Sequence, residues 1–375
     1  MTSSRLGAEV DLAVVGAGIV GLAHAVAAVE RGLSVAVIER DDAPVGASVR
    51  NFGHCCLTAQ DGTALRYGLY ARGVWQRLAK EAGFWLAEAG TVVVARSDDE
   101  LAVLDEFARL RGPDQAVLLD SGTVLDRVPV SAAGVVGGAW LPLDLRVDPR
   151  SAAPAIARWL AEQGVTFHWG TTAGSLEPGS VWTSRGPLRA RHTVVAVGHD
   201  VDRLFPDVAA AAGLRRCSLH MLRVRPTRPM VVEPAVFTGF SLLRYDGFAV
   251  CPSRDVVWQR LAGHSPRLLE AGLNLMFTQL PDGDLTVGDT HAYSTTVSPF
   301  RAEELDDLVR TEIGGLLGPV ELTVRERWTG VYASAREPYL IDTPLPGARI
   351  ASVTSGIGMT TAFGFAADVV DDLIA

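Results

Sequence analysis

The stretch from Leu12 to Arg40, LAVVGAGIVGLAHAVAAVERGLSVAVIER, decides the fold of this chain. It opens with an apolar run that predicts a strand over 12–15. It continues with an Ala- and Val-rich helix that ends near Gly32, and it closes with a second apolar strand over 35–38. A strand, a helix and a strand in this order make a βαβ unit, which is the building block of a parallel sheet.

Three glycines at the first turn indicate what this unit binds. Gly16, Gly18 and Gly21 form the GxGxxG pattern. Gly16 permits the tight turn, Gly18 lets the backbone approach a pyrophosphate, and Gly21 lets the helix pack closely on the strand. Glu39 follows about twenty residues later, where a carboxylate accepts hydrogen bonds from ribose hydroxyls. These residues predict a dinucleotide site, and the charge of Glu39 disfavours a phosphorylated ribose.

The composition is that of a soluble enzyme. The chain has 375 residues, of which 48% are hydrophobic, so two domains are expected. The net charge of -9 argues against nucleic acid or an anionic membrane as the main partner. The N-terminus lacks the order of segments of a secretory signal, and the most apolar window is interrupted by glycines. We therefore expect a cytoplasmic protein; its oligomeric state is left open.

The stretch VRNFGHCCLT over 49–58 raises the question of a metal site or a disulfide. The chain has four cysteines, and they form neither a CxxC pair nor a zinc-like spacing, so no metal site is expected. The adjacent Cys55 and Cys56 would need a strained disulfide, and the cytosol keeps thiols reduced. Both are therefore interpreted as small packing groups.

The remaining segments predict two kinds of structure. A strand is expected over 91–95 and a helix over 98–111. A helix followed by a strand begins at Asp148, an apolar strand runs from Arg191 to Gly198, and a strand, a glycine turn and a helix begin at Arg349. Between about residues 214 and 322, short alternating runs with turn signals at 245–247 and 281–284 predict an antiparallel sheet.

Together these segments predict an α/β plus α+β fold. A discontinuous Rossmann-like nucleotide domain is expected over residues 1–85, 143–212 and 325–375. An inserted, mainly antiparallel substrate domain is expected over 86–142 and 213–324.

Six motifs in order resemble the FAD-dependent D-amino acid oxidase, glycine oxidase and sarcosine oxidase superfamily over nearly the whole chain. They are GAGIVG, the pair Glu39-Arg40, SVRNFG, DPR…GVTFHWGTTAGSLE, VVAVG and SGIGMT. The resemblance implies FAD as cofactor and a last helix whose N-terminus faces the flavin. It implies cofactor contacts from Gly16, Ala17, Gly18, Ile19, Gly21, Glu39, Arg40, Ser48, Arg50, Asn51, Gly53, Ala173, Gly198, Gly356, Gly358, Met359 and Thr360.

Two departures from the superfamily pattern occur in WTGVYAS. Gly330 stands where sarcosine oxidases carry the cysteine that binds flavin covalently, so the FAD is expected to be non-covalent. Tyr332 stands where glycine oxidase and D-amino acid oxidase carry an arginine for the substrate carboxylate. A tyrosine offers one hydrogen bond and no fixed charge, which disfavours a free α-amino acid. Arg336 is one candidate for the lost cation, or a surface ion-pair residue.

The motifs RNFG, GDTHAY over 288–293 and WTGVYAS are most similar to a bacterial subgroup associated with aminophosphonate breakdown. This similarity implies an oxidase of a small anionic amine, such as a 2-aminoethylphosphonate derivative. The imine product would hydrolyse to an aldehyde plus ammonia or methylamine, and O2 would become hydrogen peroxide. The candidate substrate-site residues are His54, His291, Tyr332 and Arg336, with no catalytic base assigned.

Other interpretations stay open at this point. The chain could be a glycine- or sarcosine-type amino acid oxidase, or a 2-hydroxy acid dehydrogenase that passes electrons to a carrier. It could also be a nucleotide-sensing protein without turnover. His54 and His291 could equally be satisfied core histidines.

Overall fold

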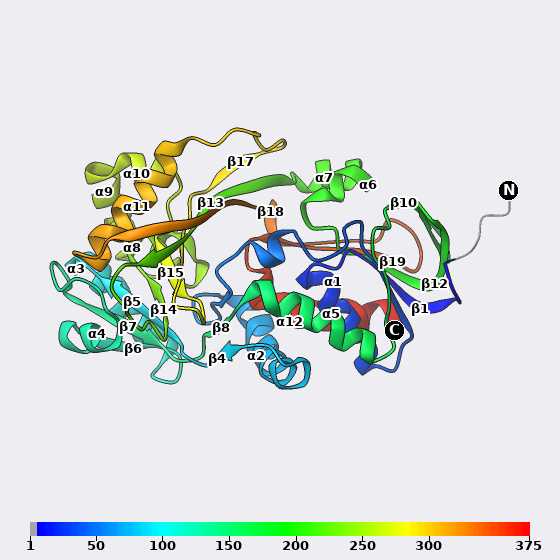
Figure 1. The fold of residues 1–375 in the computed structure, drawn as a ribbon, viewed down its shortest axis with the longest axis horizontal. Helices are drawn as coiled ribbons and strands as arrows, with labels where there is room; N and C mark the ends of the chain where they lie inside the picture. The colour runs from blue at the N-terminus through cyan, green and yellow to red at the C-terminus, as the bar shows by residue number, and fades with distance from the viewer. Residues whose placement is uncertain (1–5) are drawn as a thin grey trace.

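The computed structural model describes residues 6–375, and its elements form two halves that lie side by side along the long axis (Figure 1). One half contains the predicted βαβ unit, made of β1 (Val10–Val15), α1 (Ile19–Glu30) and β2 (Val35–Ile38). The prediction for this stretch is confirmed. Gly32, just after the helix, has a φ of 75°, the left-handed conformation that commonly ends helices.

A parallel sheet forms the centre of this half. It adds three strands to the unit: β9 (Thr166–His168), β12 (Gly186–Val195) and β19 (Ala348–Ser355). Their order is β19, β12, β1, β2 and β9, and every neighbouring pair is parallel. The carboxyl ends of these strands therefore meet at one edge of the sheet, where α/β proteins bind ligands.

Four helices pack together beside this sheet (Figure 1). They are α1 and, in addition, α2 (Gly62–Ala82), α5 (Pro149–Glu162) and α12 (Gly358–Ile374). Helix α1 lies close to the sheet because Gly21 has no side chain: a Cβ atom there would be 1.9 Å from the carbonyl oxygen of Gly16. This is the packing role that the glycine motif predicts for Gly21.

The other half is mainly an antiparallel sheet. In spatial order it contains β6 (Val117–Asp120), β7 (Gly137–Leu141), β5 (Thr91–Ala95), β14 (Ala235–Phe237), β15 (Met276–Gln279), β16 (Leu285–Gly288) and β13 (Arg215–Pro226). Only the pair β14–β5 is parallel among these neighbours. The hairpin predicted at 281–284 joins β15 to β16, and the amide of Leu280 donates to the carbonyl of Asp284 at 2.8 Å. The mixed fold class is confirmed.

One long strand, β18 (Leu322–Asp342), connects the two halves. It pairs with β13 up to Ser334 and with β19 from Tyr339 to Asp342. The predicted border at 324/325 therefore falls inside a continuous strand. The domain ranges stay a prediction, and their first residues, 1–5, lie outside the described part of the chain.

Helices interrupt the segment that was expected to contain short strands. They are α8 (Gly239–Arg244), α9 (Arg254–His264), α10 (Pro266–Glu270) and α11 (Glu303–Leu317). Two of them are six residues or shorter and α9 buries only Val257 and Leu261, so these three show little periodicity; α11 was missed despite its 15 residues. Within residues 6–375, no helix has the length and apolar character needed to span a membrane.

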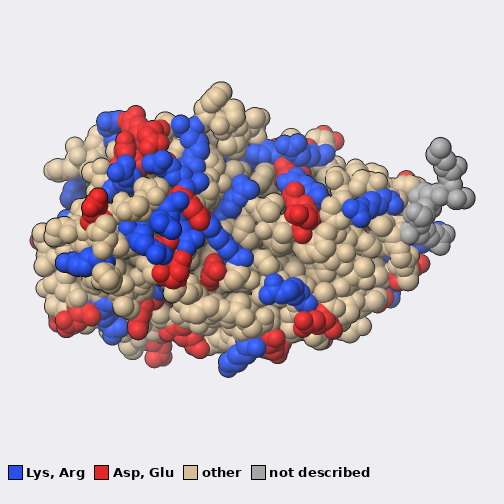
Figure 2. All heavy atoms as spheres, viewed as in Figure 1, with Lys and Arg blue, Asp and Glu red and all other residues tan. Residues whose placement is uncertain are grey.

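Charged side chains of both signs are mixed on the face shown in Figure 2. On β13, Arg223 donates from Nε to Asp284 at 2.6 Å and also pairs with Glu326 of β18. Glu326 is in turn 2.6 Å from Arg150 of α5, which belongs to the other half. The pair Arg150–Glu326 is exposed on both sides, and such a pair contributes roughly 0–1 kcal/mol, whereas the carboxylate of Asp284 is buried.

Candidate active site

A cavity of about 450 Å³ opens at the carboxyl ends of the parallel strands. Val15, Ile38 and Ala196, at or just after the ends of β1, β2 and β12, contribute to its walls. The first turn of the glycine motif lines it through Gly16 and Gly18. A cavity of this size is in the range of about 300–1,000 Å³ that small-molecule and cofactor sites occupy.

Glu39 lies on the wall of the cavity at the end of β2. One oxygen accepts the amide of Ala17 at 2.7 Å and the other accepts the amide of Asp41 at 3.1 Å. The carboxylate is thereby held beside the glycine turn. This position fits a group that accepts hydrogen bonds from ribose hydroxyls.

The loop after β2 is folded by Ser48 and Asn51. Ser48 Oγ accepts the amide of Ile19 at 2.7 Å, at the first turn of α1. The Asn51 side chain does not line the cavity, because it donates to the carbonyls of Ala47 and Ser48 within the loop. Gly53 is also away from the cavity: a Cβ atom there would be 1.9 Å from the carbonyl of Val147, so its close approach is to another strand and not to a flavin.

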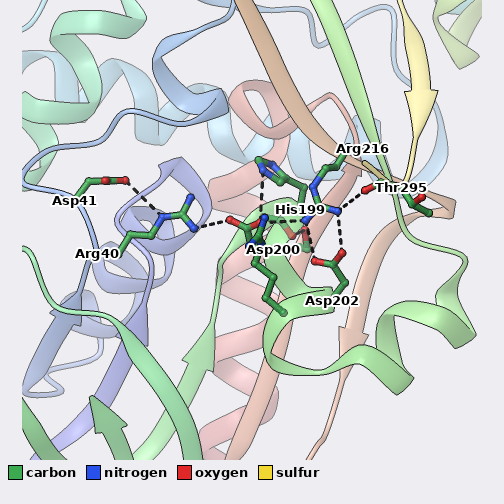
Figure 3. A network of polar contacts seen from close by, with 10 residues as sticks. Arg40, Asp41, His199, Asp200, Asp202, Arg216 and Thr295 are labelled. Carbon is green, nitrogen blue, oxygen red and sulfur yellow. Dashed lines mark hydrogen bonds and ion pairs between the residues drawn. The ribbon is translucent and has the colours of Figure 1, made fainter. Parts of the chain in front are cut away.

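A network of arginines and aspartates closes the cavity wall beside Arg40 (Figure 3). Asp200 accepts Arg40 Nη1 at 2.6 Å and Arg216 Nη2 at 3.1 Å. Arg216 also binds Asp202 and the carbonyl of Thr295, so the network links the end of β2 to β13. Burial opposes the charge of Asp200, but its charged neighbours outweigh burial and the pKa of this carboxyl is lowered.

The other end of the cavity is lined by Tyr332, Gly356 and Met359. Gly356 has a φ of 79°, and a Cβ atom there would lie 2.8 Å from the ring of Tyr332. The turn before α12 and the tyrosine of β18 are therefore packed against each other without a gap. The N-terminus of α12 therefore lies beside Tyr332 at this end of the cavity.

Arg244 is the residue that the sequence interpretation missed. It is the last residue of α8, and its Nη2 donates to Tyr332 Oη at 3.1 Å and to the carbonyl of Ser355 at 3.0 Å. Its Nε donates to His291 Nε2 at 3.3 Å. A guanidinium from a separate element thus contacts Tyr332, which lines this end of the cavity, although Arg244 itself is not among the lining residues. No local pattern identifies it, since 88 positions separate Arg244 from Tyr332.

His291 is brought to Tyr332 and Arg244, but it is not part of the cavity wall. Its side chain is 6% exposed, and its Nδ1 is 2.8 Å from the carbonyl oxygen of Gly272. Asp289 Oδ2 lies 3.7 Å from His291 Nε2. The structure therefore supports its placement near the candidate substrate end and not a direct contact with the cavity.

His54 and Arg336 are not brought to the cavity, which corrects the expectation for both. His54 lies in β3 (His54–Cys55), which pairs with β8 (Leu145–Val147). This pairing turns the buried ring toward Thr91 Oγ1 at 2.7 Å and Asp144 Oδ2 at 3.3 Å. Arg336 is exposed, and it lies between Ser334 and Tyr339, where the pairing of β18 with β19 is irregular.

Most of the expected cofactor residues do line the cavity. These are Gly16, Gly18, Ile19, Glu39, Arg40, Ser48, Arg50, Ala173, Gly198, Gly356, Gly358 and Met359. The expected residues outside its wall are Ala17, Gly21, Asn51, Gly53 and Thr360. Three polar residues after β12 line it without having been predicted: His199, Asp200 and Arg203. The sequence could have indicated these three residues, since they follow an apolar strand whose carboxyl end is expected at a ligand site.

The cysteines are buried and lie outside the cavity wall. Burial raises the pKa of Cys55, and it raises the pKa of Cys56 to about 11. The amide of Cys56 donates to Thr360 Oγ1 at 3.1 Å, so Thr360 holds the segment around 55–56 against α12. Protonated, buried thiols of this kind act as packing groups.

A sequence model of the DAO family, described as FAD dependent oxidoreductase, matches residues 11–372. The chain belongs to this family. It is therefore an FAD-dependent oxidoreductase, and FAD is its cofactor. The relatives named below have different activities.

Among curated proteins, the chain is 28% identical over 277 residues to an opine oxidase subunit of Rhizobium meliloti, covering 68% of this chain and 74% of that protein. It is 26% identical to the "Bifunctional protein ThiO/ThiG" of Trichormus variabilis, covering 65% of this chain and 38% of that protein. Among solved structures, glycine oxidase from Geobacillus kaustophilus matches with a TM-score of 0.78 and 19% identity, over 98% of this chain and 95% of that chain. At that identity the likeness establishes the shared fold.

The residues of the cavity fit FAD. The first turn of α1 offers backbone amides for a pyrophosphate, and the Glu39 carboxylate stands beside them. At the opposite end, the apolar side chains of Val331, Val353 and Met359 provide a surface for a flat ring. The cavity therefore has a glycine turn, a carboxylate and an apolar surface that can hold the pyrophosphate, the ribose and the ring of FAD.

Proposed function

We propose that this FAD-dependent oxidoreductase oxidises the C–N bond of a small primary or secondary amine that carries an anionic group. The observation that carries the proposal is the guanidinium of Arg244, which lies behind the cavity wall and donates to Tyr332, a lining residue at the end of the cavity away from Glu39. FAD, when bound, supplies the chemistry by accepting a hydride from the carbon next to nitrogen and passing the electrons to O2.

Arg244 has the donors that an anion needs. Its Nε and Nη2 groups are used by His291, Tyr332 and Ser355, whereas Nη1 has no acceptor among residues 6–375. Guanidinium groups bind carboxylate and phosphate-like oxygens through their N–H groups, and Nη1 leaves such donors for an anion. In this proposal Arg244 binds the anion, and Tyr332 adds a second polar contact and fixes the orientation of the guanidinium.

The phosphonate prediction depended on the absence of a cation at position 332. Arg244 supplies a cation at that place from α8, so the tyrosine does not by itself exclude a carboxylate. The motifs RNFG and GDTHAY support an aminoalkylphosphonate such as a 2-aminoethylphosphonate derivative. The guanidinium, together with relatives named opine oxidase and glycine oxidase, supports an amino acid as second candidate. An aminoalkylphosphonate and an amino acid are both small amines that carry an anionic group, and the proposal covers both.

Peroxide release in air tests the proposal. The panel contains 2-aminoethylphosphonate, its N-methyl form, glycine, sarcosine, ethylamine and a 2-hydroxy acid. We expect turnover of at least one anionic amine and much lower kcat/KM for ethylamine. Turnover of the 2-hydroxy acid alone, or no bleaching of the flavin by any amine without oxygen, would contradict the proposal.

The variants Arg244→Met and Arg244→Lys test the role of the guanidinium. Removing the charged partner of a desolvated anion costs roughly 2–5 kcal/mol, so kcat/KM for the anionic amine should fall about 30-fold or more in Arg244→Met. Arg244→Lys keeps the charge but not the planar group, and it should retain part of the activity. Equal losses for ethylamine and for the anionic amine would show a general defect and not an anion site.

A further inference from the structure

His291 is buried beside Arg244 and is separate from the cavity wall. We infer that His291 is a positioning residue for Arg244: its neutral ring accepts the Arg244 Nε–H and so keeps the Nη1 edge of the guanidinium directed at the substrate anion. The inference rests on the proposed function, because it assigns the reason why Arg244 can bind that anion.

Hydrogen bonding determines which ring nitrogen of His291 carries the proton. Nδ1 lies 2.8 Å from the carbonyl oxygen of Gly272, which can only accept, so Nδ1 is the protonated nitrogen. A neutral imidazole then has its lone pair on Nε2, where the Nε–H of Arg244 arrives at 3.3 Å. A doubly protonated ring would place two donors against each other at this contact.

The turn that holds the ring is closely fitted to it. Gly272 has a φ of 60°, and a Cβ atom there would be 2.7 Å from the carbonyl oxygen of His291. The amide of His291 also donates to the carbonyl of Ala271 at 3.0 Å. Backbone and ring are thus both attached to the segment after α10, and this attachment aims Nε2 at Arg244.

Burial favours the neutral form of the His291 ring, and the charged groups around it act in both directions. Asp289 lies 3.7 Å from Nε2, Arg244 lies against it, and the rings of Tyr293 and Tyr332 are both centred 6.5 Å away. Burial lowers the pKa of His291, and Arg244 lowers it further while Asp289 opposes both. Oδ1 of Asp289 has no hydrogen-bond partner among the described residues, and burial raises the pKa of this carboxyl.

Two amide variants separate positioning from packing. In His291→Asn the side-chain amide reaches the place of Nδ1 and can still bind Gly272, but it stops short of Arg244. In His291→Gln the amide oxygen reaches the place of Nε2 and can accept from Arg244. A merely structural histidine would tolerate the two amides in the opposite order or equally.

The readout is the affinity of the FAD-loaded protein for methanesulfonate, followed by the change in flavin absorbance. This probe is not oxidised, and its single charge is constant over the working pH range. We expect His291→Asn to weaken binding about tenfold, the loss of one hydrogen bond to a charged group. We expect His291→Gln to stay within about threefold of wild type, equivalent to less than 1 kcal/mol. KM for the amine should follow the same order, with kcat changed less.

The pH dependence gives an independent readout. Binding of methanesulfonate to the wild type should weaken as the pH falls through the lowered pKa of His291, because the protonated ring no longer accepts from Arg244. In His291→Gln this dependence should be reduced. Equal affinity of wild type and His291→Asn, or equal loss in both variants with equal loss of melting temperature, would overturn the inference. If Arg244→Met also binds the probe like wild type, the proposed function fails instead.

Discussion

Replacing Glu39 by alanine should weaken FAD binding far more than it alters the chemistry of the flavin-saturated enzyme. Glu39 lines the cavity at the end of β2 and is held there by the amides of Ala17 and Asp41. It is placed to accept ribose hydroxyls. The other carboxylates of the cavity wall are Asp41, two positions further on, and Asp200, which is paired with Arg40 and Arg216.

The magnitude follows from the bonds that the carboxylate makes. A hydrogen bond to a charged acceptor contributes about 1.5–3 kcal/mol, so losing the ribose contacts should raise the Kd for FAD about ten- to 150-fold. In Glu39→Ala, the amides of Ala17 and Asp41 also lose their acceptor in the apoprotein. Water can accept from these amides in part, because they border the cavity. The free energy of unfolding of the apoprotein should fall by about 1 kcal/mol.

The assay titrates apoprotein with FAD and follows flavin fluorescence. Glu39→Gln keeps one acceptor oxygen without charge and should give an intermediate Kd. Asp42→Ala is the matched control, since Asp42 is exposed, lies three positions away and is outside the cavity wall. A Kd for Glu39→Ala equal to that of wild type would refute the reasoning and place the ribose elsewhere. An equal change in Asp42→Ala would show a non-specific charge effect.

Three further predictions concern other parts of the structure. Acid precipitation should release FAD and leave a colourless pellet, because no cysteine of residues 6–375 lines the cavity; a yellow pellet would indicate covalent attachment. Burial lowers the pKa of His24 to about 4, so its contribution to stability is complete above its ordinary pKa of 6.5 and is lost as the pH falls toward 4. Between pH 8 and 5 the wild type should lose about 2 kcal/mol of unfolding free energy more than His24→Leu in urea titrations, and parallel pH profiles would disprove this. Gly356→Ala should cost about 1–3 kcal/mol of stability and raise KM, since its φ of 79° and the adjacent Tyr332 ring leave no room for a side chain; unchanged KM would contradict the close packing.

The residues of local motifs could be assigned from the sequence because their roles depend on short-range geometry. The spacing of Gly16, Gly18 and Gly21 is set by one turn and one helix, and the structure reproduces it. Glu39 follows from the length of the same βαβ unit. The helices α3 (Asp98–Arg111) and α5 and the strand β5 were likewise predicted, because each repeats a simple apolar period.

The substrate end of the cavity could not be predicted in this way. Arg244 and Tyr332 are 88 positions apart, and only the folded chain brings α8 and β18 together at their hydrogen bond. The apparent loss of a cation at position 332 was therefore misleading, since a guanidinium from a distant helix lies 3.1 Å from the Tyr332 hydroxyl. Chemical equivalence in space does not require equivalence in sequence position.

His54 and Arg336 were expected at the substrate site, and they show that closeness in sequence does not predict the direction of a side chain. His54 follows the flavin loop in sequence, but the pairing of β3 with β8 decides which way its ring points, and the ring is turned to Thr91 and Asp144. Arg336 is four positions after Tyr332, but it is exposed and lies where the pairing of β18 with β19 is irregular. The sequence by itself determined the family of fold and the cofactor, because these depend on contacts between neighbours in the chain. Only the tertiary structure decided which side chains meet at Tyr332, because strand pairing and register set side-chain direction across long sequence separations.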